Sequence, residues 1–154
     1  MKHKLSIFTQ HGQFYVADKD SPGDTGGEFW NDEAHHDRLA IDVGILGISI
    51  ENDEATANIE IELLDTRPVE SDLNQFDHVV EGSLSIVSGK LQIQDCPNSQ
   101  VELEITLAPA CYRLQVCFSD LRKARQVNPE DRYLIRIWKE AFSQRRVLKR
   151  WHSS

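Results

Sequence analysis

The 154-residue chain lacks the features that mark several protein classes. Its three cysteines are odd in number, and their spacing forms neither a disulfide framework nor a CxxC metal clip. No run of about 18 apolar residues occurs, so no membrane span is expected. The opening MKHKLSIFTQHGQFYV has a broken apolar segment and no small-residue cleavage site, so we expect no signal peptide and a cytoplasmic protein.

The known catalytic motifs are absent as well. The chain contains no G-x-S-x-G, no P-loop, no GxGxxG, no H-E-x-x-H and no EF-hand loop. His35 and His36 are adjacent, and on a helix their side chains point about 100° apart, which is unsuited to sharing one metal ion. We therefore predict no enzyme, no catalytic residues, no metal site and no cofactor. A metal-dependent enzyme that uses His35 and His36 stays open as an alternative, and it predicts bound metal.

Length and composition favour one folded domain. A chain of this length can bury a core without disulfide or metal staples, and 40% hydrophobic residues argue against disorder. No internal repeat or linker divides the chain. We expect a single domain over residues 1–139, followed by a basic C-terminal tail over residues 140–154 that is helical from Lys139 to Trp151.

Alternation of apolar and polar residues with period 2 predicts strands along most of the chain. IEIELL shows it clearly, with Ile59 and Ile61 on one face and Glu60 and Glu62 on the other. Similar patterns occur in QFYVAD, LSIVSGKLQIQ, QVELEITL, CYRLQVCF and RYLIRIWK, where the pattern places Arg113, Gln115, Arg132 and Arg136 on outward faces. About eight or nine such strands, separated by Gly, Pro, Asp and Asn, favour an all-β antiparallel sandwich.

Three local features refine this prediction. The apolar run from Leu39 to Ile50 changes face near Gly44 and Gly47, which predicts a bulge or bend in a strand that changes faces or sheets at a corner of the sandwich. Ser88-Gly89 is interpreted as the turn of a β-hairpin. Residues 31–38 are expected to form one short helix, because Asn31 is a good N-cap and acidic residues follow in the first turn.

Charge is distributed unevenly along the chain. Up to Leu121 there are 22 acidic residues against 7 Lys and Arg, whereas from Arg122 onward there are 10 Lys and Arg against 3 acidic residues. An acidic body repels the phosphates of nucleic acid, so we expect no direct nucleic-acid binding by this part. It suits a basic protein partner and would steer association with it.

Several short segments, in order, resemble the competence protein J family. They are LSIFTQHGQFYVADKD, FWNDEA, LAIDVGILGISIENDEATANIEIELL, LAPACYRLQVCF and YLIRIW, and they span roughly residues 4 to 139. Ala110 and Lys139 depart from the family pattern, which favours glycine and proline there, and the basic tail lies outside it. The namesake of the family inhibits a DNA-entry nuclease in competent Bacillus. The resemblance therefore implies a bacterial, non-enzymatic, β-rich protein that binds a protein partner.

These arguments predict a protein-binding module that inhibits a basic nuclease through an acidic surface. The predicted partner-binding residues are Trp30, Asp32, Glu33, Asp37, Glu51, Asp53 and Glu54. Trp30 is interpreted either as an interface anchor or as a plug at one end of the core. A β-sandwich that binds a small ligand or carbohydrate through Trp30, Tyr15 and the acidic loop stays open as an alternative. The inhibitor predicts association that weakens steeply with salt, whereas the ligand-binding module predicts little salt dependence.

Overall fold

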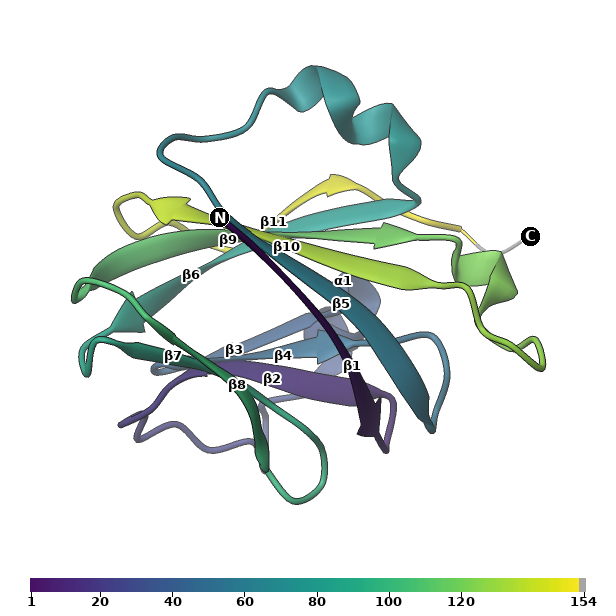
Figure 1. Cartoon of the computed structure of the whole chain (residues 1–154), viewed down its shortest axis with the longest axis horizontal. Helices are drawn as coiled ribbons and strands as arrows, with labels where there is room; N and C mark the ends of the chain where they lie inside the picture. The colour runs from purple at the N-terminus through teal and green to yellow at the C-terminus, as the bar shows by residue number, and fades with distance from the viewer. Residues whose placement is uncertain (153–154) are drawn as a thin grey trace.

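The computed structural model describes residues 1–152 and contains two β-sheets that pack face to face (Figure 1). The six-stranded sheet has the order β1-β5-β10-β9-β6-β11, with β1 (Lys2–Thr9), β5 (Ala55–Leu63), β6 (His78–Ile86), β9 (Ala110–Ser119), β10 (Arg132–Lys139) and β11 (Arg146–Lys149). The five-stranded sheet has the order β3-β4-β2-β7-β8, with β2 (Gln13–Asp18), β3 (Leu39–Asp42), β4 (Ile45–Ser49), β7 (Lys90–Gln94) and β8 (Val101–Thr106). The predicted β-sandwich is confirmed, and residues 1–152 form eleven strands with one parallel pair, β5 with β10.

The main core lies between the two sheets and follows the period-2 pattern. On β5, Ile59 and Ile61 are buried in it, while Glu60 and Glu62 lie on the outer face. Burying a large apolar side chain stabilises the fold by about 1.5–3 kcal/mol, so this alternation fixes which face of each strand points inward. Among residues 1–152, none of the helices has the length and apolarity needed to cross a membrane.

The apolar run from Leu39 to Ile50 is a hairpin and not one bent strand. β3 and β4 pair with each other, with Leu39 opposite Ile48 and Asp42 opposite Ile45. The chain reverses at Val43-Gly44, where Gly44 has a φ of 69°, a conformation that glycine adopts without strain. The face change that the sequence shows therefore reflects a tight turn within the five-stranded sheet.

The segment around Ser88-Gly89 is also different from the expected hairpin. β6 belongs to the six-stranded sheet and β7 to the five-stranded one, so the turn carries the chain across the sandwich. The buried Asp18 carboxylate holds this crossing by accepting hydrogen bonds from the backbone N–H groups of Val87 and Ser88, at 3.1 and 3.2 Å. A single carboxylate thus connects β2 to the link between the sheets.

The outer face of the six-stranded sheet is covered by a third layer. An arch (residues 64–77) that contains the 3-10 helix η1 (Glu70–Gln75) passes over it (Figure 1). The C-terminal segment (residues 140–152) adds the stretch before β11, where the carbonyls of Ser143 and Gln144 accept hydrogen bonds from Arg113. Under this layer Arg113, Gln115 and Arg136, predicted to point outward, are buried. Their side chains do point away from the core, but the arch and the C-terminal segment cover them and exclude water.

Glu81 is the centre of the polar network in this layer. Its carboxylate accepts hydrogen bonds from Arg113 at 3.0 Å, from Arg67 at 2.9 Å and from Gln115 at 2.9 Å. Arg67 also makes a bidentate pair with Glu140, at 3.1 and 2.8 Å. Because every charge in the network has a partner of opposite sign, the desolvation that burial imposes is offset.

The predicted C-terminal helix is wrong. Residues 146–149 form β11, which pairs antiparallel with β6, Arg146 opposite Glu81 and Val147 opposite Val80. The outer edge of β6 presents unpaired backbone N–H and C=O groups, and β11 pairs with them. A short helix without tertiary packing is only marginally stable in water, so the strand is favoured over the helix. Residues 153 and 154 of the predicted tail lie outside the described residues.

Candidate protein-binding surface

The predicted short helix is present and is placed by its capping residues. Helix α1 (Asp32–Asp37) begins after Asn31, whose side-chain oxygen accepts a hydrogen bond from the backbone N–H of Ala34 at 2.8 Å. It ends at Arg38, which has a left-handed φ of 67°. Ala34 and Asp37 face the protein and are buried, so Asp32 and Glu33 are left exposed at the first turn.

Trp30 is half-buried on the outer face of the five-stranded sheet. Its ring contacts Phe29 edge-on with centroids 5.8 Å apart, and it lies 5.1 Å from the ring of His35. Its Nε1 donates a hydrogen bond to the Gln13 side chain. Gly47 makes room beneath, since a Cβ at that position would lie 2.8 Å from Phe29 and 2.9 Å from Trp30. Trp30 thus joins a small outer cluster and does not plug the main core.

Asp37 is buried beneath the C-terminal segment. Arg145 Nε lies 2.8 Å from one carboxylate oxygen, and Arg150 Nη2 lies 2.6 Å from the other. Burial alone would raise the pKa of the Asp37 carboxyl, but the hydrogen bonds and charges of Arg150 and Arg145 outweigh it and lower that pKa. In this state Asp37 is already neutralised from within the chain.

Glu51, Asp53 and Glu54 lie in the loop between β4 and β5. Glu51 is half-buried, and its carboxylate accepts a hydrogen bond from Arg38 Nη1 at 3.2 Å. Since Arg38 ends α1, this contact joins the helix to the loop. Asp53 and Glu54 are exposed, and the loop is held against the β1–β2 turn by a hydrogen bond of 2.8 Å from Gly12 N to Asp53 O.

The structure therefore divides the six predicted acidic residues into two groups. Asp37 and Glu51 are paired with arginines inside the fold, whereas Asp32, Glu33, Asp53 and Glu54 are exposed. Glu33 makes one ion pair, with Arg145 at 3.2 Å, and its side chain keeps 76% exposure.

Sequence reasoning left out further exposed acidic residues that precede Trp30. They lie in the loop 19–31, which is anchored near the Gly44 turn at one end and at Gln13 at the other, and they are Asp20, Asp24 and Glu28. Within residues 1–152 no salt bridge is formed by any of these three. The available signal was the absence of Lys and Arg between Lys19 and Arg38.

His78 lies behind Asp37 and is fully buried. Its Nε2 is 2.9 Å from the backbone oxygen of Asp37, and its Nδ1 accepts a hydrogen bond from the backbone N–H of Trp151 at 3.1 Å. Nδ1 is thus the acceptor and Nε2 carries the proton. Burial is the main cause that lowers the pKa of His78 to about 4, so the ring is neutral at neutral pH.

The residues of the two alternative sites, for a small ligand or carbohydrate and for a metal ion, do not come together as those alternatives require. Tyr15 is only 5% exposed, and its hydroxyl contacts Gln13 and Cys96, so it offers no open ring face for a sugar. A hollow of about 650 Å³ lies instead on the outer face of the six-stranded sheet, lined by Lys4, Leu134 and Phe76 among others. Across residues 1–152, no three His, Cys, Asp or Glu side chains come together in a way that could hold a metal ion.

Comparisons with known proteins identify shared folds. No family model matches the chain, and no curated protein matches it in sequence. The structure of ComJ from Bacillus subtilis, an inhibitor of the DNA-degrading activity of NucA, superposes with a TM-score of 0.66 and 21% identity, over 91% of this chain and 96% of ComJ. The protein described as crocagin biosynthetic gene J superposes with a TM-score of 0.62 and 14% identity, over 92% of this chain and 98% of that chain. The resemblance to competence protein J is thus confirmed at the level of the fold.

Proposed function

We propose that this chain is a non-enzymatic, cytoplasmic bacterial protein that inhibits a basic nuclease by covering its DNA-binding cleft with an acidic surface. The surface consists of Trp30 with the exposed carboxylates of α1 and of the β4–β5 loop, namely Asp32, Glu33, Asp53 and Glu54. Asp37 and Glu51 support it from beneath through their arginine partners. The fold shared with an inhibitor of a DNA-degrading nuclease supports this proposal.

The observation that carries the proposal is the charge of this region. Between residues 20 and 54 the chain has ten acidic residues and a single Lys or Arg, Arg38, and the fold adds only Arg145, which pairs with Glu33 and Asp37, and Arg150, which pairs with Asp37, within the described residues. Arg38 does not offset the surface, because its guanidinium is turned to Glu51 and lies 5.1 Å from the ring of Trp151. A nuclease needs a basic cleft to bind phosphates, and a rigid acidic surface competes for that cleft and accelerates its own association.

The experiment begins with capture at low salt. The immobilised chain is incubated with lysate of the source organism, the bound proteins are eluted with a salt gradient, and the fractions are assayed for DNA degradation. We expect one basic nuclease that elutes at moderate salt and loses activity when the chain is added back. An eluate with no nuclease activity that the chain inhibits would contradict the proposal.

Matched variants locate the surface on the chain. Asp32→Asn/Glu33→Gln removes two charges from α1, whereas Glu102→Gln/Glu104→Gln removes two exposed charges from β8 in the other part of the five-stranded sheet. The first pair should raise the concentration needed for half-inhibition about tenfold or more, in line with a few interfacial charge contacts of about 0.7 kcal/mol each or more. Equal effects of both pairs would mean that only net charge matters and would remove α1 from the site.

A further inference from the structure

The C-terminal segment lies against α1 and the edge of β6, and its contacts show which side chains this surface can bind. Arg145 and Arg150 flank β11, and each donates to a different oxygen of Asp37. The same guanidinium groups also donate to backbone carbonyls, Arg145 to Leu39 O at 3.1 Å and Arg150 to His36 O at 2.6 Å. The surface is therefore built to hold two arginines that lie on either side of a short extended strand.

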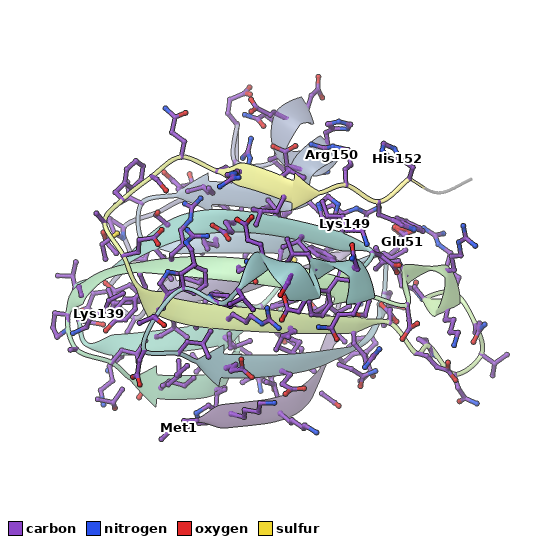
Figure 2. All side chains as sticks on the ribbon, turned by 90° about the horizontal axis from the view of Figure 1, so that it is seen from above. Met1, Glu51, Lys139, Lys149, Arg150 and His152 are labelled. Carbon is purple, nitrogen blue, oxygen red and sulfur yellow. The ribbon has the colours of Figure 1, made fainter. Side chains whose placement is uncertain are left out.

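Backbone contacts complete the seat of this strand. β11 pairs with residues 79–81 of β6, with a register shift between Val147 and Lys149. Lys149 Nζ donates to the carbonyls at the end of η1, including Asn74 O at 3.4 Å, and the backbone N–H of Trp151 donates to His78. Figure 2 shows the segment running from Lys139 at one side of the molecule to Lys149, Arg150 and His152 at the side where Glu51 lies.

The two halves of the C-terminal segment are held by different kinds of contact. Buried Arg113 donates to Ser143 O at 3.0 Å and to Gln144 O at 2.9 Å, and Ser83 exchanges hydrogen bonds with the backbone of Ser143. Residues 141–144 are themselves exposed, so this anchor consists of hydrogen bonds to the backbone, whereas residues 145–151 are mostly half-buried and depend on the ion pairs to Asp37. Residues 145–152 are held by a four-residue strand at the edge of the sheet, by the partly buried side chains of Val147, Leu148 and Trp151, and by ion pairs to Asp37 that salt weakens, so we expect them to open before the central strands do.

We propose that residues 145–152 occupy a docking site for an arginine-bearing extended segment of the basic partner, and that the partner displaces them when it binds. The site consists of the β6 edge at residues 79–81, the Asp37 carboxylate and the neighbouring Glu33. This inference rests on the proposed function in taking the partner to be a basic protein. The chain's own segment must leave before the partner can bind. The apparent affinity for the partner is therefore the intrinsic affinity multiplied by the fraction of molecules in which the site is open.

The test uses the chain's own sequence as the probe. A labelled peptide of residues 143–152, SQRRVLKRWH, is titrated into the full-length wild-type chain and into the full-length variant Arg145→Gln/Arg150→Gln. The variant loses both ion pairs to Asp37, so its own segment competes less, and we expect the peptide to bind it at least tenfold more tightly than wild type. Adding Asp37→Asn to this variant should abolish the gain, and so should about 0.5 M NaCl.

Two controls separate this site from general charge effects. Lys19→Gln/Arg122→Gln also removes two exposed positive charges, and neither side chain makes a hydrogen bond or ion pair within residues 1–152, so this variant should bind the peptide like wild type. A peptide with Gln in place of both flanking arginines should bind all variants weakly. Equal affinity of the original peptide for wild type, the double variant and the Asp37→Asn triple variant would overturn the proposal.

A second readout does not depend on how the double variant folds. In the wild-type chain, excess peptide should raise amide hydrogen exchange at Val147 and Lys149, while the paired residues of β6 stay protected. Unchanged protection at saturating peptide would count against displacement. A dimer in light scattering that the peptide dissociates would assign the site to a second copy of the chain and would overturn the choice of partner.

The outcomes distinguish this inference from the proposed function. A chain that inhibits a nuclease but whose double variant gains no peptide affinity keeps its function and loses the docking site. A chain whose variant binds the peptide but that captures no inhibited nuclease has the docking site without the proposed role.

Discussion

Trp151 donates its backbone N–H to Nδ1 of His78, across 73 positions of sequence and at 3.1 Å. The contact joins the end of the C-terminal segment to a fully buried imidazole, which on its other side meets the backbone oxygen of Asp37 at 2.9 Å. Protonation of Nδ1 would remove this acceptor. The pairing therefore makes the attachment of the segment depend on pH.

The first prediction concerns stability against pH. Because the pKa of His78 is about 4 in the folded state and about 6.5 in an unfolded chain, the unfolded chain binds more protons between these values. The free energy of unfolding should then fall as pH decreases from about 6.5 towards 4, by at most about 1.4 kcal/mol per pH unit from this residue. Urea unfolding at several pH values measures the slope. His78→Asn should flatten it, whereas His36→Asn, at an exposed position, should leave it unchanged.

The second prediction concerns the network around Glu81. Glu81→Ala leaves Arg113 buried without its carboxylate partner, which should cost about 3–5 kcal/mol of unfolding free energy. Glu60→Ala removes a more exposed carboxylate that pairs with Lys2 at 3.4 Å and should cost about 1 kcal/mol or less. Chemical denaturation of both variants provides the comparison. Similar losses for the two would mean that the network around Glu81 contributes no more than a surface pair.

The third prediction concerns the seat of the aromatic pair. Gly47→Ala would place a Cβ at 2.8 Å from Phe29 and 2.9 Å from Trp30, so the rings must move. We expect a loss of about 1–3 kcal/mol and a change in tryptophan fluorescence. Gly26→Ala, where the nearest atom is 3.4 Å from the new Cβ, is the control and should change stability by less than about 0.5 kcal/mol. An unchanged emission spectrum in Gly47→Ala would show that the rings do not pack on this glycine.

The fourth prediction concerns the attachment of β11. Asp37→Asn removes the charge that holds Arg145 and Arg150, so the amides of β11 should exchange at least tenfold faster. The central strand β9 should keep its protection, because it pairs with β10 and β6 on both sides. Asp32→Asn, an exposed acid on the same helix, should leave β11 unaffected. Hydrogen exchange measured by mass spectrometry or NMR resolves these segments.

Features set by neighbouring residues were predictable from the sequence. The alternation on β5 is visible in IEIELL, and the position of α1 follows from Asn31 and the acidic residues after it. Both depend on contacts within a few residues. The face of each strand and the start of the helix could therefore be inferred without knowing the fold.

Features set by contacts between distant residues were not predictable from the sequence. Arg113 is adjacent in sequence to alternating core residues, and its burial depends on Glu81 and on the carbonyls of Ser143 and Gln144. The C-terminal segment has helical and strand character alike, and the free edge of β6 decides between them. The sequence also showed that the first part of the chain is acidic and the C-terminal tail basic. The positions of the charged residues in the sequence did not indicate that Arg145 and Arg150 would bind Asp37.

The attachment of β11 has a consequence for handling the protein. β6 is buried along most of its length and contains Val79, Val80, Leu84 and Ile86, and within residues 1–152 the strand that pairs with its outer edge near residues 79–81 is β11. A protease that cleaves the exposed residues 141–144 would free this edge as a template for strand pairing between molecules. Clipped preparations should therefore aggregate before they unfold, and an affinity tag is better placed at the N-terminus, where β1 forms the opposite edge of the sheet.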